Sequence, residues 1–383
     1  MTDFNAINST TISGRQFKVF AAEDASVGNP NTDDADFKQI DVEGITLPTF
    51  SPNQEFEMRS GSGRVAEFSQ MFSSSKGVVT EFTLTGRLDQ INCAMFAENV
   101  TGNEAGEGGS NLGVVDINTG YSGGANMKDG DTINSGDYHQ TLTFYFQAPT
   151  TSDSYTLFGC ICTNFQITGD MGTASGRFDY SATFRTQYKP SKAAVTMLAG
   201  QFTAIPSTQM FLSDMSTKYL NMLDVGGSSF YRNFPVFNSI SLTFDAPAVF
   251  MGASGSDAEP EVIGRALPEM NITFGASLKY DDETDNLLEA HRDANQNSYI
   301  QLAMATHAFS GSSTAPAADA VFNNNLYFGD DNAHGLGIIF HQAKLISASV
   351  GSGDVATVDI EAKIVDQGTN YILRLATGDT SSD

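Results

Sequence analysis

Strict alternation of apolar and polar residues marks the clearest strands in this chain. In residues 177–185 every second side chain is apolar and the others are charged or carry hydroxyl groups, as in a strand with one buried and one wet face. Residues 161–168 alternate in the same way, and the intervening GDMGTASG favours a turn. We predict an antiparallel hairpin whose first strand turns four residues to one side: Ile161, Thr163, Phe165 and Ile167.

A second hairpin of the same design lies near the C-terminal end. Residues 336–350 precede the turn-forming GSGD, and residues 355–365 then alternate between apolar and mostly charged positions. Earlier segments also correspond in order. GITL resembles SISL, a Gly/Ser-bearing segment follows each, and the strand-like VVTEFTLTG and MNITFGASLKY come next. Each strand then leads into a helical candidate, RLDQINCAMFAENV or DETDNLLEAHRDA. The chain is therefore predicted to contain one β-rich unit twice.

This repeat divides the chain into five parts. They are an N-terminal arm (1–14), a first β unit (15–190), a connecting segment (191–230), a second β unit (231–375) and a C-terminal tail (376–383). The connecting segment contains AVTMLAGQFTAIPSTQMFL, which is too apolar for a free linker, so we expect it to pack on one or both units. Residues 100–138 are rich in turn-forming residues and predict a long exposed excursion.

The composition supports strands and argues against nucleic-acid binding. The 383 residues include 28 Phe, 12 Tyr, 36 Gly and no Trp, a mixture typical of strands and turns. The net charge of −25 would have to be overcome by a local basic patch, and the sequence has none. Neither an export signal nor a run of about 18 apolar residues is visible, so we expect a soluble protein that is not exported.

No pattern of residues predicts catalysis, a metal centre or a cofactor. Nucleophile elbows, phosphate-binding loops, dinucleotide fingerprints and zinc spacings are all missing from the sequence. The acids at 281–285 suit the start of a helix, and those at 33–36 suit a solvated loop. The three cysteines, Cys93, Cys160 and Cys162, are expected to be buried thiols. We predict that the protein is not an enzyme and has no cofactor.

The segment FGCICTNFQITGDMGTASGRFDYSATFRTQY and the earlier GITLPTFSPNQEFEMRSGSGR resemble the tail tube (major tail) proteins of long non-contractile-tailed bacteriophages, the siphophages. The resemblance implies a mainly β fold, with two similar β-sandwich or half-barrel domains that each carry one flanking α-helix. It implies rings stacked into a tube, with an inner β-barrel shared between subunits. Because such rings present six units, a chain with two units implies a trimeric, pseudo-hexameric ring.

The same resemblance implies a place and a set of partners. The protein would be a virion component, assembled in the host bacterial cytoplasm, and DNA would pass through its channel without specific binding. Tape-measure, tail terminator and baseplate or distal tail proteins would be its partners. Candidate channel-lining carboxylates are Glu81, Asp179, Asp359 and Glu361, whose charge would repel passing phosphates.

Two loop segments carry apolar residues that are unfavourable for free loops, and we expect these residues to stack on the next ring. They are Phe50, Phe56, Met58, Phe68, Met71 and Phe72 in residues 48–77, and Val249, Phe250, Met251, Val262 and Ile263 in residues 245–269. Folding back on their own unit is the alternative. Other classes of protein also stay open: a phage baseplate, fibre or capsid-decoration protein, a secreted β-sandwich adhesin, and an acidic β-sandwich hydrolase.

Overall fold

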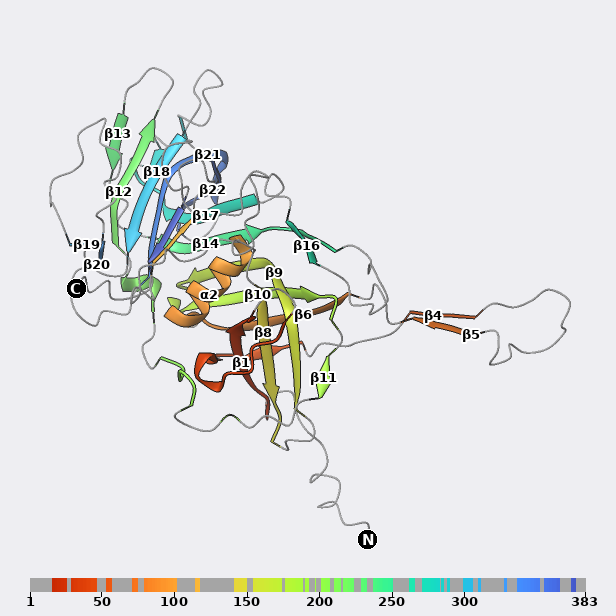
Figure 1. Cartoon of the computed structure of the whole chain (residues 1–383). Coiled ribbons are helices and arrows are strands. Elements are labelled where there is room, and N and C mark those ends of the chain that lie inside the picture. The colour runs from red at the N-terminus through yellow and green to blue at the C-terminus, as the bar shows by residue number, and fades with distance from the viewer. Residues whose placement is uncertain are drawn as a thin grey trace, which may run out of the picture.

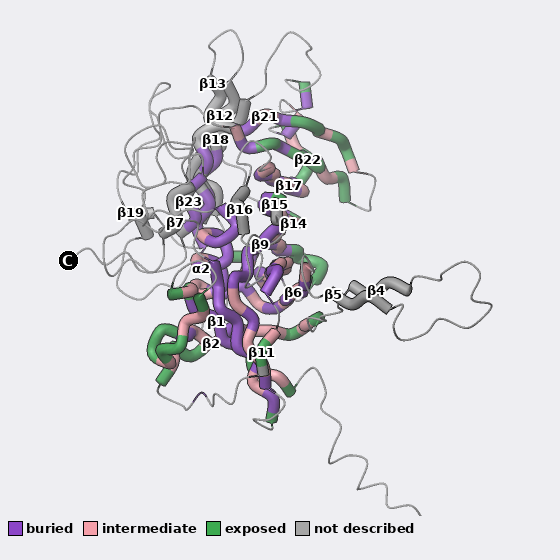
Figure 2. The backbone as a smooth tube through the Cα atoms, turned by 45° about the vertical axis from the view of Figure 1, so that its right-hand side comes forward, coloured by how far each residue is buried: buried purple, intermediate pink, exposed green. Residues whose placement is uncertain are grey.

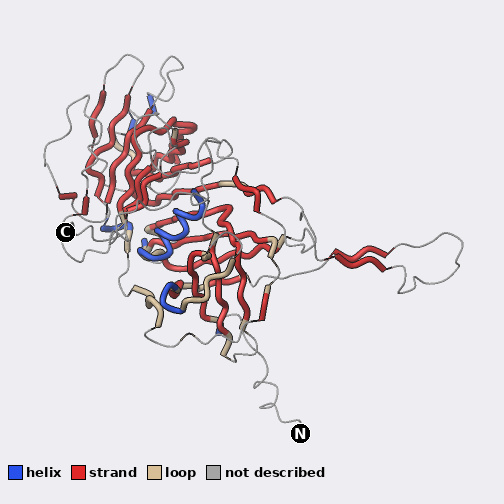
Figure 3. The backbone as a smooth tube through the Cα atoms, in the orientation of Figure 1, coloured by secondary structure: helices blue, strands red, loops and turns tan. Residues whose placement is uncertain are grey.

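The structure of the protein is a computed structural model. The described residues are 16–25, 29–46, 53–56, 71–74, 79–101, 114–117, 141–149, 154–173, 176–188, 190–192, 197, 201–206, 210–214, 216–223, 229–232, 237–250, 262–265, 271–282, 284–285, 288–289, 299–305, 309–310, 327–328, 336–351, 355–365 and 373–376. Within them the fold is mainly β, as the alternating patterns predict, with one large antiparallel sheet (Figure 3). The predicted arm at 1–14 and residues 377–383 of the predicted tail lie outside these ranges.

The large sheet takes strands from both halves of the chain (Figure 1). The N-terminal half contributes β1 (Lys18–Glu23), β2 (Lys38–Ile40), β3 (Gly44–Ile45), β6 (Thr80–Arg87), β7 (Val114–Ile117), β8 (Leu142–Gln147), β9 (Tyr155–Asp170), β10 (Phe178–Thr186) and β11 (Ser191–Lys192). The C-terminal half contributes β12 (Ser216–Leu223), β13 (Ser229–Arg232), β14 (Phe237–Asp245), β17 (Asn271–Lys279), β18 (Tyr299–Ala305), β21 (Gly337–Gly351), β22 (Thr357–Ile364) and β23 (Leu373–Ala376).

The two halves pair their strands in the same order. In the first, the order is β3–β6–β10–β9, and β9 continues into β8–β1–β2. In the second, the order is β14–β17–β22–β21, and β21 continues into β18–β12–β13. β14 also pairs with β9, so one sheet runs through both halves.

Each half has two groups of paired strands, and the long strands β9 and β21 each belong to both groups of their half. The final part of β9 pairs with β10, whereas its first part pairs with β8. Where β9 meets β10 the register skips Thr163, and where β21 meets β22 it skips Ile346. Each long strand has a second bulge opposite β8 or β18. Because bulges bend a strand and increase its twist, they let one strand pass between layers.

Two stretches predicted as a connecting segment and an exposed excursion contain strands of the sheet. β12 and the start of β13 lie within 191–230, the predicted connecting segment, and pair with each other and with β18. β7 lies within the predicted excursion at 100–138 and pairs with β23 of the other half. A short apolar run such as VVDI can pair with a sheet edge although it is too short to show a long alternating pattern. The sequence pattern therefore did not predict this strand.

Phenylalanine fills the core beneath α2 (Gln90–Thr101), the predicted first helix. Phe96 on this helix is fully buried, and its ring meets four aromatic rings from β8, β9 and β10: Phe144, Phe165, Tyr180 and Phe184. Figure 2 shows the buried backbone running through the neighbouring strands. A helix packed on one face of the strands explains why the buried residues of β6 and β10 alternate with less buried ones.

Both halves start a helix with the same reciprocal hydrogen bonds. Asp89 accepts from the backbone N–H of Asn92 at 2.9 Å, and the Asn92 side-chain oxygen accepts from the Asp89 N–H at 2.9 Å. In the second half, Asp281 accepts from the Thr284 N–H at 3.1 Å, and Thr284 Oγ1 accepts from the Asp281 N–H at 2.8 Å. Residues 282, 284–285 and 288–289 are helical. Asp281 is therefore a helix cap, as predicted.

Replacing Asn92 by alanine is expected to lower the free energy of unfolding by about 1–3 kcal/mol. The change removes the acceptor for the buried Asp89 N–H and the donor to the Arg87 carbonyl, while leaving the Asp89 cap itself in place. Urea denaturation followed by circular dichroism measures the loss. An Asn92→Ala protein as stable as the wild type would mean that these buried groups find other partners.

Candidate functional site: the polar sheet face and its open edges

One face of the large sheet is polar across eight consecutive strands. From β3 to β21, in the order β3–β6–β10–β9–β14–β17–β22–β21, hydroxyl, amide and charged residues alternate with buried apolar ones. The register links them into rows of directly opposed residues. One row runs through Arg87, Asp179, Thr168, Ser241, Gly275, Glu361 and Ser347. The face is thus continuous across the junction between the halves, with the apolar core on the opposite side.

The four predicted channel-lining carboxylates all lie on this polar face. Asp179 on β10 and Glu361 on β22 belong to the same row, four strands apart by way of β9, β14 and β17. Asp359 lies two residues before Glu361 on β22, and both are exposed. Glu81 is exposed on β6, opposite Arg185. The structure therefore brings these residues onto one surface, and their place in a channel stays a prediction.

Arginine side chains on and beside this face are held in ion pairs. The Arg177 guanidinium contacts Glu43 at 2.8 Å and Asp179 at 2.7 Å, and Arg185 contacts Glu81 at 3.3 Å. The hydrogen bond from Arg177 lowers the pKa of Glu43. Burial raises the pKa of Asp179, because desolvation outweighs its attraction to Arg177. These pairs reduce the positive potential of the face, whereas Asp359 and Glu361 form no ion pair within the described part of the chain.

The loop segments predicted to stack between rings each contain a small hairpin. In the first, β4 (Asn53–Phe56) pairs with β5 (Met71–Ser74), which brings Phe56 opposite Met71. This hairpin lies away from the large sheet in Figure 1. In the second, β15 (Ala248–Phe250) pairs with β16 (Val262–Arg265). The remaining candidates, Phe50, Met58, Phe68 and Met251, lie outside the described residues.

The eight strands that carry the polar face end in two edges that have no partner strand among the described residues. β3 pairs only with β6, and β21 has no neighbour along residues 345–351 on the side opposite β22. Two apolar side chains are exposed along the edge of β21: Ile346 is 49% exposed and Val350 is 48% exposed. Sequence reasoning did not single them out. The signal was available, because Val350 continues the apolar alternation of Ala348 at the end of the strand.

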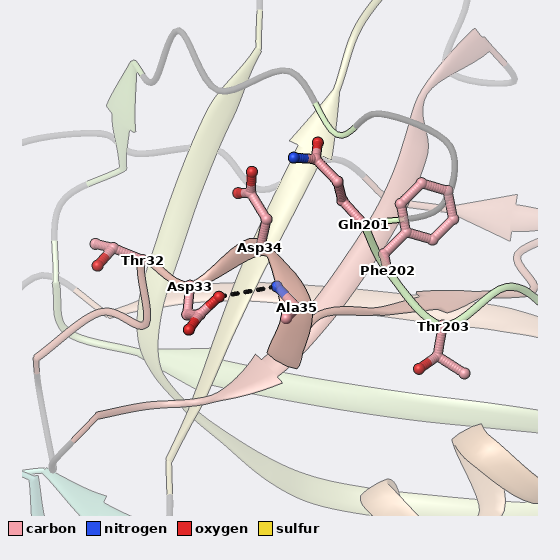
Figure 4. Close-up of a pocket in the computed structure, with 7 residues that line it drawn as sticks. All are labelled: Thr32, Asp33, Asp34, Ala35, Gln201, Phe202 and Thr203. Carbon is pink, nitrogen blue, oxygen red and sulfur yellow. Dashed lines mark hydrogen bonds between the residues drawn. The ribbon is translucent and has the colours of Figure 1, made fainter.

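The pocket in Figure 4 does not gather convergent chemistry. It is lined by Thr32, Asp33, Asp34, Ala35, Gln201, Phe202 and Thr203. One carboxylate oxygen of Asp33 accepts a hydrogen bond from the Ala35 N–H at 3.0 Å and so caps the short 3-10 helix Asp34–Asp36. The acids of this loop thus serve local structure.

The cysteines are buried, as predicted, and none of the three forms a disulfide. Burial raises the pKa of the thiols of Cys93 and Cys160, which keeps them protonated and unreactive. Across the described ranges, no three His, Cys, Asp or Glu side chains gather in a way that could hold a metal ion. Nor does any helix found there have the length and apolar character to span a membrane.

Comparisons with known proteins identify no relative for this chain. No protein-family model matches the sequence, and no curated protein matches it significantly. The polar face and the open edges therefore carry the functional argument by themselves.

Proposed function

We propose that this protein is a structural virion protein that self-assembles into the tail tube of a long-tailed, non-contractile bacteriophage. The observation that carries this proposal is the common pairing order of the two halves, joined edge to edge by β9 and β14. An edge-to-edge junction between similar units is the contact that a ring repeats, and a closed ring leaves no sheet edge exposed.

The two halves are proposed to be equivalent domains. The shared pairing order, the shared bulges and the shared helix caps of Asp89 and Asp281 support this. Each domain supplies four strands of the polar-faced sheet and one helix over its core. Because β12 pairs with β18, the proposed second domain would also include residues before 231, the start expected from the sequence. Three chains would then supply the six domains of a pseudo-hexameric ring.

The polar face is proposed to line the channel. Its apolar side is covered by α2 and the core, so only the polar side is free to face a water-filled bore. The exposed acids on this face, such as Glu361, would repel the phosphates of passing DNA. The ends of the tube would meet tape-measure, terminator and baseplate or distal tail proteins in the virion.

Electron microscopy of the purified protein tests the proposal. Hollow tubes or stacked rings are expected in negative stain, together with a mass in solution well above 40.9 kDa. Monodisperse monomers or solid fibres over a range of concentrations and salt would contradict it. A capsid-decoration protein or an adhesin would give the monomers, and a fibre protein would give the fibres.

Charge reversal tests which face lines the channel. The double change Asp359→Lys and Glu361→Lys is expected to make tubes retain short double-stranded DNA at low salt, because both exposed side chains would then face the bore with positive charge. Wild-type tubes should not retain DNA. The matched control is Asp33→Lys with Asp34→Lys, which adds the same charge at the open pocket, on the loop between β1 and β2 and outside the strands of the polar face. Equal DNA retention by both double variants would place Asp359 and Glu361 outside the channel.

A further inference from the structure

The junction between the halves shows how two such edges fit. β14 lies antiparallel to β9, with Leu242 opposite Ile167 and Ser241 opposite Thr168. Phe244 stacks on Phe165 across the junction, with ring centroids 5.9 Å apart. Leu242 and Ile167 are almost fully buried. The junction therefore buries its apolar residues on the core side and keeps its polar residues on the open face.

The open edges of β21 and β3 correspond to the two sides of this junction. The bulge residue Ile346, which has no partner on β22, corresponds to the bulge residue Thr163, which has no partner on β10. Aligning the two bulges aligns β21 with β9. In that correspondence Val350 matches Ile167 and Gly351 matches Thr168. On the other side, β3 lies against β6 as β14 lies against β17, so Ile45 matches Ile240 and Thr46 matches Ser241.

Exposure along the edge of β21 marks the missing neighbour. Val350 is 48% exposed although the matching Ile167 is 0% exposed, and Ile346 is 49% exposed although the matching Thr163 is 9% exposed. An apolar strand edge without a partner pairs readily with another chain. The core-side position is therefore buried on β9, where β14 is the neighbouring strand, and exposed on β21, which has no such neighbour among the described residues.

We propose that residues 345–351 of β21 pair antiparallel with β3 of a second copy of this chain, in the register of the β9–β14 junction. This inference rests on the proposed tube assembly and fixes its lateral contact. In this register Thr46 of one copy lies opposite Gly351 of its neighbour, as Ser241 lies opposite Thr168 within one chain. The contact is head to tail, so each copy offers one β3 edge and one β21 edge, and a ring closes when the last edge meets the first.

A disulfide test reads this register directly. Directly opposed residues of antiparallel strands have Cα atoms roughly 4.5–5.5 Å apart, within the range that a disulfide bridges. The assembled Thr46→Cys, Gly351→Cys protein is expected to form covalent oligomers on mild oxidation, ending at the number of copies in one ring. A Cβ at Gly351 meets Thr357 Oγ1 at 2.5 Å, so that hydroxyl must rotate. The buried native cysteines do not compete.

The chain provides its own control for the disulfide. The pair Thr168→Cys, Ser241→Cys occupies the matching positions of the internal junction and should crosslink within one chain, leaving the mass unchanged. Either single cysteine of the Thr46 and Gly351 pair should give no ladder. If tubes form and the internal pair oxidises, but the Thr46 and Gly351 pair stays monomeric on non-reducing gels, the proposed seam is wrong and the tube function survives. Covalent closed rings without tubes would leave the seam standing and contradict the tube.

A second pair of variants separates the two faces of the same edge. Val350→Lys puts a charge on the core side and is expected to abolish lateral assembly, whereas Ser349→Lys adds the same charge on the polar face and should leave assembly intact. Circular dichroism of the Val350→Lys monomer confirms folding, since this side chain is already half exposed in one chain. Normal assembly of folded Val350→Lys, or loss of assembly in both variants, would overturn the proposed register.

Discussion

Replacing Phe96 by alanine is expected to lower the free energy of unfolding by about 3–5 kcal/mol, the largest effect of any single change considered for this chain. The side chain is 0% exposed, and its ring lies 5.0 Å from that of Phe184 and 5.5 Å from that of Tyr180, measured between centroids. Truncation loses the free energy gained by burying the ring, and it leaves a cavity that the strands beneath α2 cannot fill. Urea denaturation monitored by tyrosine fluorescence and circular dichroism measures the loss.

Two further substitutions set the scale for the Phe96→Ala result. Leu288→Ala changes a side chain that is 1% exposed in the helix of the second half, and about 2–5 kcal/mol is expected. Met171→Ala changes a side chain that is 41% exposed, so a loss within about 0.5 kcal/mol is expected. If Phe96→Ala cost no more than Met171→Ala, the aromatic cluster would not be the core of the first half.

Replacing Asp89 by asparagine is expected to remove about 3 kcal/mol of pH-dependent stability between roughly pH 4 and pH 6. Burial raises the pKa of Asp89 from 3.8 to about 6 in the folded protein, despite hydrogen bonds from the N–H groups of Asn92 and Ile91. The folded state therefore holds this proton more tightly than the unfolded state. Stability from this group is present below pH 3.8 and is lost as the pH rises through 6.

The Asp89→Asn protein should lack this loss, because asparagine caps a helix as well as aspartate and carries no charge to desolvate. Free energies of unfolding at pH 4, 5, 6 and 8 test this, and the variant should be the more stable protein at pH 8. Asp359→Asn removes an exposed carboxylate of the polar face and serves as the control. A wild-type pH profile in Asp89→Asn would show that the buried carboxyl does not titrate in this interval.

Local alternation failed at one identifiable position. The sequence predicts that Ile161 and Thr163 share a face with Phe165, yet the core beneath α2 includes Cys160, Cys162 and Phe165. The reason is the bulge at Thr163, which shifts the alternation of β9 by one residue. Such a bulge depends on how two strands pair with each other, so its position cannot be predicted from the residues of one strand.

Sequence alone determined the mainly β fold, the two alternating hairpins, the helix over the first core, the cap at Asp281 and the common polar face of Asp179 and Glu361. These features follow from periods of two or about four residues, which a single strand or helix already expresses. Only the tertiary structure decided that β14 joins β9, that β7 reaches β23, and that Val350 stands uncovered at an edge. Pairings between distant strands depend on the geometry of the whole sheet, because hydrogen-bonded edges of similar composition can pair in many ways until the fold selects one.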